Sequence, residues 1–462
     1  MSKIKKILLL SPPGEKIYIR DYYCSKTSKA DYINAPIDLV ILSGILAKNF
    51  SLYHIDAIVD NLNEERCLRY ISKIHPDAVI SLVGSVSWKE DIRFLKRLKN
   101  SIDCKLILSG DLLLTKAKEK MAESKEIDCI LTDFSDSSIK DYLMGKRGNL
   151  TGMVYRYKSK IIETPKNKAK YFTADLPRHD LFINKKYKIP FVRKFPFATV
   201  LTDYGCPYRC SFCIMNWLGY KSRKLDEVLK ELEYLKKNKV KTIFFADQTF
   251  GLNKKRTIKL CKEMAKNFSF EWFCFSRVDM VDYELLKLMK KAGCILIMFG
   301  VEFGNDATLK EFKKDYTKKQ VRKAFKLSKK VGIETLATFL IGMPSEDRQK
   351  CIETINFAKE LDPDFASFNF AVPRFNTPLR NKALRKGLIK EDSETMDQAG
   401  SFISMPTISL TKKEVSELRR KAICSFYLRP LYILKRISKI RTIPQLKHYI
   451  SNFLFLLKSL LK

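Results

Sequence analysis

The chain has 462 residues, of which 45% are hydrophobic and 11% aromatic, enough to bury the cores of two or three ordinary domains. Composition therefore excludes a chain that is disordered throughout. No stretch reaches the ~18 uncharged apolar residues that a membrane-spanning helix needs, and the first apolar run ends at Pro12 and Pro13. We expect neither an integral membrane protein nor a secreted one, and we predict a cytoplasmic location.

Charge is the second compositional feature. The chain carries 87 Lys and Arg against 51 Asp and Glu, a formal net charge of +36. Such an excess favours nucleic acid, an anionic lipid surface or an acidic small molecule as a partner. It is equally typical of a Lys-rich protein whose lysines cover helix faces. The twelve cysteines are too dilute for a disulfide scaffold.

Residues 1–145 alternate short apolar runs with helix-like segments, the pattern of a parallel sheet wound with helices. The pattern predicts strands at 5–14, 53–60, 77–84, 105–110 and 127–133. In open sheets of this kind, ligands bind outside the carboxyl ends of the strands. We therefore predict a Rossmann-like domain whose binding site includes the turns at Pro12, Gly84 and Gly110.

Residues 146–195 differ in character, because they are rich in Lys and Arg and poor in acids. The segment MVYRYKSKIIET predicts a small hairpin, and a basic linker follows it. We place a domain boundary in this region.

Longer strand and helix units follow in residues 196–405. Six strands are predicted, at 198–204, 242–250, 270–279, 295–304, 334–344 and 364–373. Six such units in tandem predict a partial (β/α)6 barrel of the TIM type, whose chemistry lies at the carboxyl ends of its strands.

Residues 406–462 form a predicted helical, basic tail. From Arg419 to Lys462 there is no Asp or Glu, and the basic residues alternate with apolar ones, including the run FLFLLKSLL at 453–461. This combination predicts basic amphipathic helices. Two interpretations stay open: peripheral attachment to the inner, anionic face of a membrane, or a helical cap that closes the barrel mouth.

A cysteine loop carries the clearest chemical signal. The segment DYGCPYRCSFC places Cys206, Cys210 and Cys213 directly after a predicted strand. Cytosolic thiolates are the usual ligands of zinc and of iron–sulfur clusters. A structural zinc ion would need a fourth ligand, and the neighbouring histidines, His179 and His448, are far away along the chain. Three ligands to a cubic cluster instead leave one iron open for a substrate.

With Phe212 before the last cysteine, the GCPYRCSFC segment resembles the radical S-adenosylmethionine (radical SAM) superfamily. The resemblance implies that the three cysteines hold a [4Fe–4S] cluster whose open iron binds the methionine portion of S-adenosylmethionine. It further implies reductive cleavage to a 5′-deoxyadenosyl radical that removes hydrogen from an unactivated carbon. A flavodoxin or ferredoxin would supply the electron.

Further segments resemble the superfamily in the same order along the chain. FFADQTF offers Asp247 and Gln248 for the methionine amino group, although the usual glycine–glycine–glutamate form is absent. FSRVD and GVEFGND offer Arg277 and Glu302 for the carboxylate and the ribose, with a mutual salt bridge of these two residues as the alternative. IGMPSED offers Gly342, where the missing side chain permits the adenine to approach the backbone. The resemblance assigns no residue that acts on the substrate.

The front domain resembles the cobalamin-binding domain of a large subgroup of this superfamily. The resemblance lies in the SPPG turn and the segments APIDLVILSGILA, IDAIVDN and PDAVISLVG, and it implies cobalamin near Pro12, Gly84 and Gly110. The subgroup includes methyltransferases and ring-forming enzymes. No Asp-x-His-x-x-Gly occurs, so the sequence offers no histidine ligand for cobalt.

These patterns together predict cobalamin-dependent methyl transfer to an unactivated carbon of a small-molecule or lipid substrate. One alternative is a cobalamin-independent radical SAM rearrangement or oxidation. Another is a tRNA methylthiotransferase-like enzyme, favoured by the charge and by the spacing of Cys24, Cys67 and Cys104, although the tail is not the expected all-β RNA-binding module. A basic nucleic-acid-binding scaffold would leave the cysteine loop without a role, so we expect no nucleic acid partner.

Overall fold

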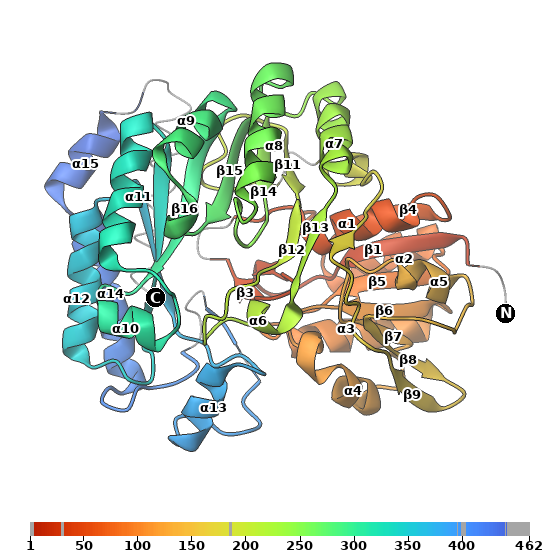
Figure 1. The fold of residues 1–462 in the computed structure, drawn as a ribbon. Helices are drawn as coiled ribbons and strands as arrows, with labels where there is room; N and C mark the ends of the chain where they lie inside the picture. Colours follow the sequence, from red (N-terminus) through yellow and green to blue (C-terminus); the bar gives the residue numbers. More distant parts are fainter. Residues whose placement is uncertain are drawn as a thin grey trace.

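The computed structural model describes residues 4–440, except 29–31, 184–186, 395, 399–402 and 439. Two α/β halves lie side by side: the front domain, red to olive in Figure 1, and the barrel, green to blue. The apolar run at 453–461, predicted as part of an amphipathic helix, lies outside the described residues.

The front domain is built on a seven-stranded sheet of order β4-β1-β5-β6-β7-β8-β9. The first five strands in this order are parallel, which confirms the predicted wound sheet. The residues of β5 are all buried, as expected of a parallel strand covered by helices on both faces. The strands are β1 (Lys6–Ser11), β4 (Ser51–Asp56), β5 (Ala78–Leu82), β6 (Lys105–Ser109), β7 (Cys129–Leu131), β8 (Met153–Tyr157) and β9 (Lys160–Glu163).

The hairpin predicted after residue 145 is present as β8 and β9, and it extends the front sheet. β8 pairs antiparallel with β7, with Tyr155 opposite Cys129. The sheet of the front domain therefore continues to Glu163, beyond the boundary placed from composition.

Five helices accompany this sheet: α1 (Ile37–Leu46), α2 (Glu64–Ile74), α3 (Trp88–Ser101), α4 (Leu113–Glu123) and α5 (Ser138–Leu143). Every residue of α1 is buried, because this helix contacts both β1 of the front sheet and β11 of the barrel. Between β1 and α1, the chain forms a short hairpin of β2 (Tyr18–Ile19) and β3 (Lys26–Thr27).

The second half is an open barrel of six parallel strands in the order β11-β14-β15-β16-β17-β18, which confirms the predicted partial barrel. The strands are β11 (Phe197–Val200), β14 (Thr242–Phe245), β15 (Glu271–Ser276), β16 (Cys294–Glu302), β17 (Glu334–Ile341) and β18 (Phe365–Phe370). The accompanying helices are α7 (Leu225–Lys237), α8 (Lys254–Asn267), α9 (Tyr283–Lys291), α10 (Asp306–Glu311), α11 (Lys318–Val331), α12 (Arg348–Leu361) and α13 (Pro378–Arg385).

A small third sheet lies near the junction of the two halves. It has the order β10-β13-β12, formed by β10 (Tyr171–Phe172), β13 (Tyr220–Arg223) and β12 (Asp203–Gly205). The short helix α6 (Met215–Leu218) and the cysteine loop connect β12 to β13. Single 3-10 turns occur at His179–Leu181 and Val278–Met280.

The described part of the tail is helical, as predicted, and has two parts. In α14 (Lys412–Tyr427), Val415 and Leu418 pack against Ile341 and Phe370 of the barrel, so this helix belongs to the outer layer. In α15 (Pro430–Ile437), by contrast, the large apolar side chains Leu431, Leu434 and Ile437 are 82%, 62% and 57% exposed. Within residues 4–440, none of the described helices has the length and apolar character needed to cross a bilayer.

Candidate functional site

One cavity of about 2010 Å³ lies between the front domain and the barrel. Its front wall includes the carboxyl ends of three strands, at Ser11, Asp56 and Leu82. The opposite wall is formed by the three thiols of the cysteine loop and by the barrel lumen. The site predicted at the edge of the front sheet and the one predicted at the barrel mouth therefore share one space.

The cysteine loop is held between two antiparallel strands. Gly205 ends β12 with φ +73°, and a Cβ there would lie 1.9 Å from the carbonyl oxygen of Gly219, so only glycine fits. The Cys206 N–H donates to that same carbonyl at 3.1 Å. Within the loop, the Cys213 N–H donates to the Cys210 carbonyl at 3.0 Å, which turns the chain so that all three thiols face the cavity.

The thiols lie in a poorly hydrated place. Burial raises the pKa of Cys206, and it raises the pKa of Cys213 to about 12. Cys206 and Cys213 therefore favour the protonated form until a positive centre displaces their protons. Within the described ranges, no three His, Cys, Asp or Glu side chains stand close enough to hold a single ion. Thiolates that bind different irons of a cubic cluster stand farther apart than the ligands of one ion.

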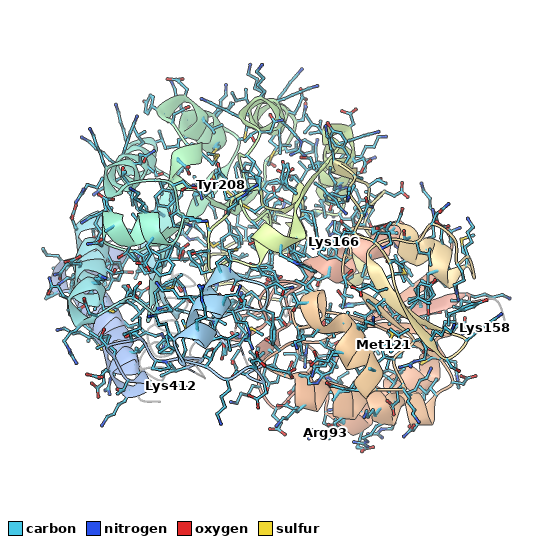
Figure 2. All side chains as sticks on the ribbon, turned by 60° about the horizontal axis from the view of Figure 1, so that its bottom comes forward. Arg93, Met121, Lys158, Lys166, Tyr208 and Lys412 are labelled. Atoms are coloured by element: carbon cyan, nitrogen blue, oxygen red, sulfur yellow. The ribbon has the colours of Figure 1, made fainter. Side chains whose placement is uncertain are left out.

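Arg277 lies directly beside the cysteine loop, at the end of β15. Its Nη1 is 3.9 Å from Cys210 Sγ, and its guanidinium lies 3.6 Å from the centre of the Tyr208 ring. Two further bonds orient it: Nη2 donates to Asp279 Oδ2 at 2.9 Å and to the Lys314 carbonyl at 2.8 Å. Figure 2 labels Tyr208 on the barrel side of the molecule.

Glu302 pairs with Lys314 and not with Arg277, so the alternative of a mutual salt bridge is wrong. Lys314 Nζ donates to Glu302 Oε1 at 3.2 Å. The backbone of Glu302 has φ +66°, next to a register shift in β16, and this conformation directs its carboxylate to Lys314. Sequence reasoning missed Lys314, since it follows α10 in the chain and approaches the barrel mouth only through the tertiary fold.

Lys314 is a buried cation on the cavity wall, near Cys210 and Glu302. Burial acts to lower the pKa of its ammonium, but Tyr316 and Glu302 raise it above its ordinary value. Arg277 likewise keeps its charge, because Asp279 outweighs burial and raises its pKa. Two permanent cations thus stand close to the cysteine loop.

Of the two candidates in FFADQTF, only Gln248 lines the cavity. Asp247 is fully buried behind it, and its carboxylate accepts bonds from the Thr202 N–H and hydroxyl, both at 2.6 Å, and from the Asp203 N–H at 3.1 Å. Burial and the neighbouring Asp203 raise the pKa of Asp247 to about 7.

Gly342 follows β17 with φ +92°, and a Cβ there would lie 2.7 Å from Val415 of α14. Its N–H donates to Glu346 Oε2 at 2.9 Å. Glycine is therefore needed for the close approach of α14, and Gly342 is absent from the described lining of the cavity.

The three front-domain candidates, Pro12, Gly84 and Gly110, are not among the described residues that line the cavity, and their contacts are within the front domain. The Pro12 carbonyl accepts a bond from Arg20 at 2.9 Å, and the Gly84 N–H donates to Asp91 at 3.0 Å. Arg20 and Asp91 are joined by a buried salt bridge of 2.7 Å. At Gly110, a Cβ would lie 1.9 Å from the Val83 carbonyl oxygen, so glycine permits the two turns to touch.

Arg374 joins the two halves across the cavity wall. It follows β18 of the barrel, and its guanidinium reaches Asp111 at 3.4 Å and Cys24 Sγ at 2.7 Å in the front domain. Cys67 and Cys104 lie in the hydrophobic core beneath, away from Cys24. The three front cysteines therefore do not converge as the methylthiotransferase alternative requires.

Sequence comparisons point to one superfamily. Residues 200–358 match the model of the radical SAM superfamily. The chain is 29% identical over 454 residues to the uncharacterized methyltransferase PH0819 of Pyrococcus horikoshii, a match that covers 94% of this chain and 95% of that protein. It is 26% identical over 363 residues to the anaerobic magnesium-protoporphyrin IX monomethyl ester cyclase of Cereibacter sphaeroides, covering 74% of this chain and 59% of the cyclase.

Among solved structures, the fold is similar to that of the cobalamin-dependent S-adenosylmethionine radical enzyme OxsB. The TM-score is 0.73 at 16% sequence identity, and the match covers 98% of this chain and 72% of that one. At this identity the likeness concerns the fold. It confirms the predicted succession of a wound front domain, a partial barrel and a helical C-terminal region.

Proposed function

We propose that this chain is a radical S-adenosylmethionine enzyme, a cobalamin-dependent methyltransferase in which Cys206, Cys210 and Cys213 hold the [4Fe–4S] cluster, since residues 200–358 match the model of that superfamily. The observation that carries the proposal is the single cavity shared by the three thiols and the edge of the front sheet. A cofactor at that edge and a cofactor at the cysteine loop would face each other across one shared cavity. The substrate carbon would lie between them.

The residues around the cysteine loop fit a bound S-adenosylmethionine. Arg277 and Lys314 offer permanent positive charge for its carboxylate, Glu302 offers a carboxylate for ribose hydroxyls, and Gln248 offers an amide for the amino group. Asp279 and Glu302 already orient the side chains of Arg277 and Lys314. Binding of S-adenosylmethionine would therefore cost little conformational entropy in these two side chains.

Cobalamin fits the front wall. The cavity, about 2010 Å³, exceeds the roughly 300–1,000 Å³ of a typical ligand pocket, so it can take more than one large ligand. Asp21 Oδ1 on this wall is buried and lacks a hydrogen-bond partner in the described structure. The three histidines in the described ranges, His54, His75 and His179, are not among the lining residues.

The chain's own contribution to the reaction is binding, orientation and exclusion of water. When bound, the cluster supplies the electron that breaks a carbon–sulfur bond of S-adenosylmethionine, and cobalamin carries the methyl group. Arg277, fixed between Tyr208 and Asp279, keeps positive charge beside the loop throughout. The aromatic lumen, with Phe244, Phe273 and Phe275, keeps water away from a reactive radical. An external flavodoxin or ferredoxin would deliver the electron.

The lining also supports a largely apolar substrate. Beyond the cysteine loop, the cavity continues along aromatic side chains to Ile423, Tyr427 and Ile433 of the tail helices. Charged side chains of α14 also line the cavity, the basic Lys413 and Arg420 and the acidic Glu417. A lipid or another extended apolar molecule with an anionic group matches this distribution.

Contact with a membrane is part of the same proposal. The stripe of Leu431, Leu434 and Ile437 on α15 points outward, and Ile437 also lines the cavity. An anionic bilayer suits it, because the chain has no acidic residue from Arg419 onward. A lipid substrate could then pass from the bilayer into the cavity along this stripe.

The decisive experiment is anaerobic reconstitution with iron, sulfide and hydroxocobalamin. We expect brown protein that retains corrinoid and forms 5′-deoxyadenosine from S-adenosylmethionine. Cys210→Ala should abolish the colour and the cleavage, whereas Cys424→Ala, at a partly exposed thiol outside the cavity, should preserve both. Colourless wild-type protein without cleavage would refute the cluster. Cluster and cleavage without corrinoid would refute methyl transfer through cobalamin and favour a rearrangement or oxidation.

A further inference from the structure

Asp38 is a buried acid that no described residue satisfies. It lies in the first turn of α1, at the junction of the two halves (Figure 1), and is 1% exposed. Neither of its carboxyl oxygens has a hydrogen-bond partner in the described structure. Asp38 nevertheless lines the cavity, next to the carboxyl edge of the front sheet.

Such a residue is unusual, because buried polar groups in proteins are nearly always hydrogen-bonded. Leaving both carboxyl oxygens of Asp38 unpaired destabilises the fold. We therefore infer that these oxygens bind a group of a ligand. Two other acids on the same side, Asp111 and Asp56, are satisfied: Asp111 accepts bonds from Ser25 and Ser85, and Asp56 accepts one from Tyr187. The missing partner of Asp38 is therefore expected in the cavity.

The surroundings of Asp38 indicate a neutral partner. Burial and the nearby Asp21 raise its pKa well above the ordinary value, which favours the neutral carboxylic acid. No Lys or Arg in the described ranges forms a salt bridge with it. Aromatic rings lie close by, with Tyr22 stacked at 5.7 Å on Tyr204. A neutral carboxylic acid presents one donor and one acceptor in one plane, which matches the edge of a primary amide.

We propose that Asp38 pairs through two hydrogen bonds with a primary amide on the rim of a bound corrinoid. The inference rests on the proposed function, since corrinoids carry several acetamide and propionamide side chains around the ring. A substrate amide would present the same chemistry. We choose the corrinoid because Asp38 lies on the front-domain side of the cavity, with Ser11 and Leu82.

The proposal predicts opposite effects on stability and on binding. In Asp38→Leu, the apoprotein should melt at a higher temperature, since an unpaired buried acid is removed. Its affinity for hydroxocobalamin, measured by anaerobic absorbance titration, should fall about tenfold, corresponding to two lost hydrogen bonds. Asp38→Asn, which keeps a donor and an acceptor, should stay within about threefold of the wild type. Iron content should not change in either variant.

A matched control is Asp136→Asn. Asp136 is a buried acid outside the cavity that is fully partnered, by the Thr151 hydroxyl at 2.5 Å and the Ser138 N–H at 2.9 Å. This variant should melt lower than the wild type and bind corrinoid equally well. A general loss of packing in the front domain would instead lower both quantities together.

A second experiment changes the corrinoid and not the protein. A corrinoid whose side-chain amides are replaced by methyl esters should bind the wild type more weakly than hydroxocobalamin does. The difference in affinity between these two corrinoids should be smaller in Asp38→Leu than in the wild type. If the wild type and Asp38→Leu bind corrinoid with equal affinity, the inference is overturned and the proposed function stands. The same holds if Asp38→Leu weakens substrate binding alone. A wild type that binds no corrinoid overturns both.

Discussion

The guanidinium of Arg277 lies 3.6 Å from the centre of the Tyr208 ring and 3.9 Å from Cys210 Sγ, so the end of the third barrel strand is in direct contact with the cysteine loop. The contact joins two segments that are far apart in sequence. It places a permanent cation where a cluster with negatively charged ligands and the carboxylate of S-adenosylmethionine would both be stabilised.

Arg277→Lys tests this contact. Lysine keeps the charge but loses the planar stacking on Tyr208 and the two bonds to Asp279. We expect normal iron content and an affinity for S-adenosylmethionine lowered about tenfold, equivalent to about 1.4 kcal/mol. Equilibrium binding to the reconstituted protein measures this. Arg322→Lys, at an exposed ion pair with Glu360, should bind like the wild type.

Gly205→Ala tests the entry into the cysteine loop. A methyl group at this position would lie 1.9 Å from the Gly219 carbonyl oxygen and would push β12 and β13 apart. Iron and sulfide content after reconstitution should fall by more than half even if the protein folds. Gly148→Ala, where a Cβ meets nothing within 4 Å, should take up the cluster normally. Full iron content in Gly205→Ala would show that the loop tolerates the displacement.

The buried carboxyl group of Glu346 should make the free energy of unfolding depend on pH. Burial raises its pKa from 4.5 to about 7, although the Met343 and Gly342 N–H groups lower it. Between these two values the unfolded chain loses the proton while the folded protein keeps it. Stability should therefore fall as pH rises from about 4.5 through 7, by about 3 kcal/mol in total from this residue.

Glu346→Gln removes that titration and keeps an acceptor for both N–H groups. Urea unfolding at pH 5, 6, 7 and 8 should show a smaller decline for this variant than for the wild type. Glu360→Gln, at the protein surface, should leave the pH dependence unchanged. Parallel curves for wild type and Glu346→Gln would contradict the prediction.

The contacts of Arg374 predict that the front domain and the barrel unfold together. Its buried guanidinium connects the barrel to Asp111 and Cys24 of the front domain. Arg374→Met leaves Asp111 without this charge partner and should cost about 3 kcal/mol of unfolding free energy. We also expect the thermal transition to broaden or split, as the two halves begin to unfold separately. Arg322→Met, at the protein surface, is the control, and a single unshifted transition in Arg374→Met would be the opposing result.

The outward stripe of α15 predicts binding to anionic vesicles. Co-sedimentation with phosphatidylglycerol vesicles should be strong for the wild type and reduced at least about fivefold for Leu431→Asp with Leu434→Asp, since apolar area is lost and negative charge is added. Leu176→Asp, at another exposed leucine, should bind as the wild type does. A wild type that does not co-sediment with the vesicles would contradict the prediction.

Short-range features of this protein were predictable from sequence. The strands of the wound sheet and of the barrel are apolar runs bounded by turn residues, and they form where those runs occur. The cysteine loop is equally local, since Cys206, Cys210 and Cys213 lie in one short segment whose turn is made by its own backbone. The α/β fold class and the likeness to the radical SAM superfamily were therefore readable from the residues themselves.

The partners of charged and buried polar groups were decided only by the tertiary structure. Arg277 pairs with Asp279 and Glu302 with Lys314, because a register shift and a positive φ at Glu302 redirect its side chain. In the sequence, Asp38 is the one charged residue of an apolar helical segment, IDLVILSGIL, and that segment does not show what would pair with its carboxyl group. It becomes a buried, unpaired group because α1 is covered on one side by the front sheet and on the other by the barrel. The apolar pattern of α1 predicts burial, but the position of Asp38 on the cavity wall depends on how the two halves pack, which no local pattern encodes.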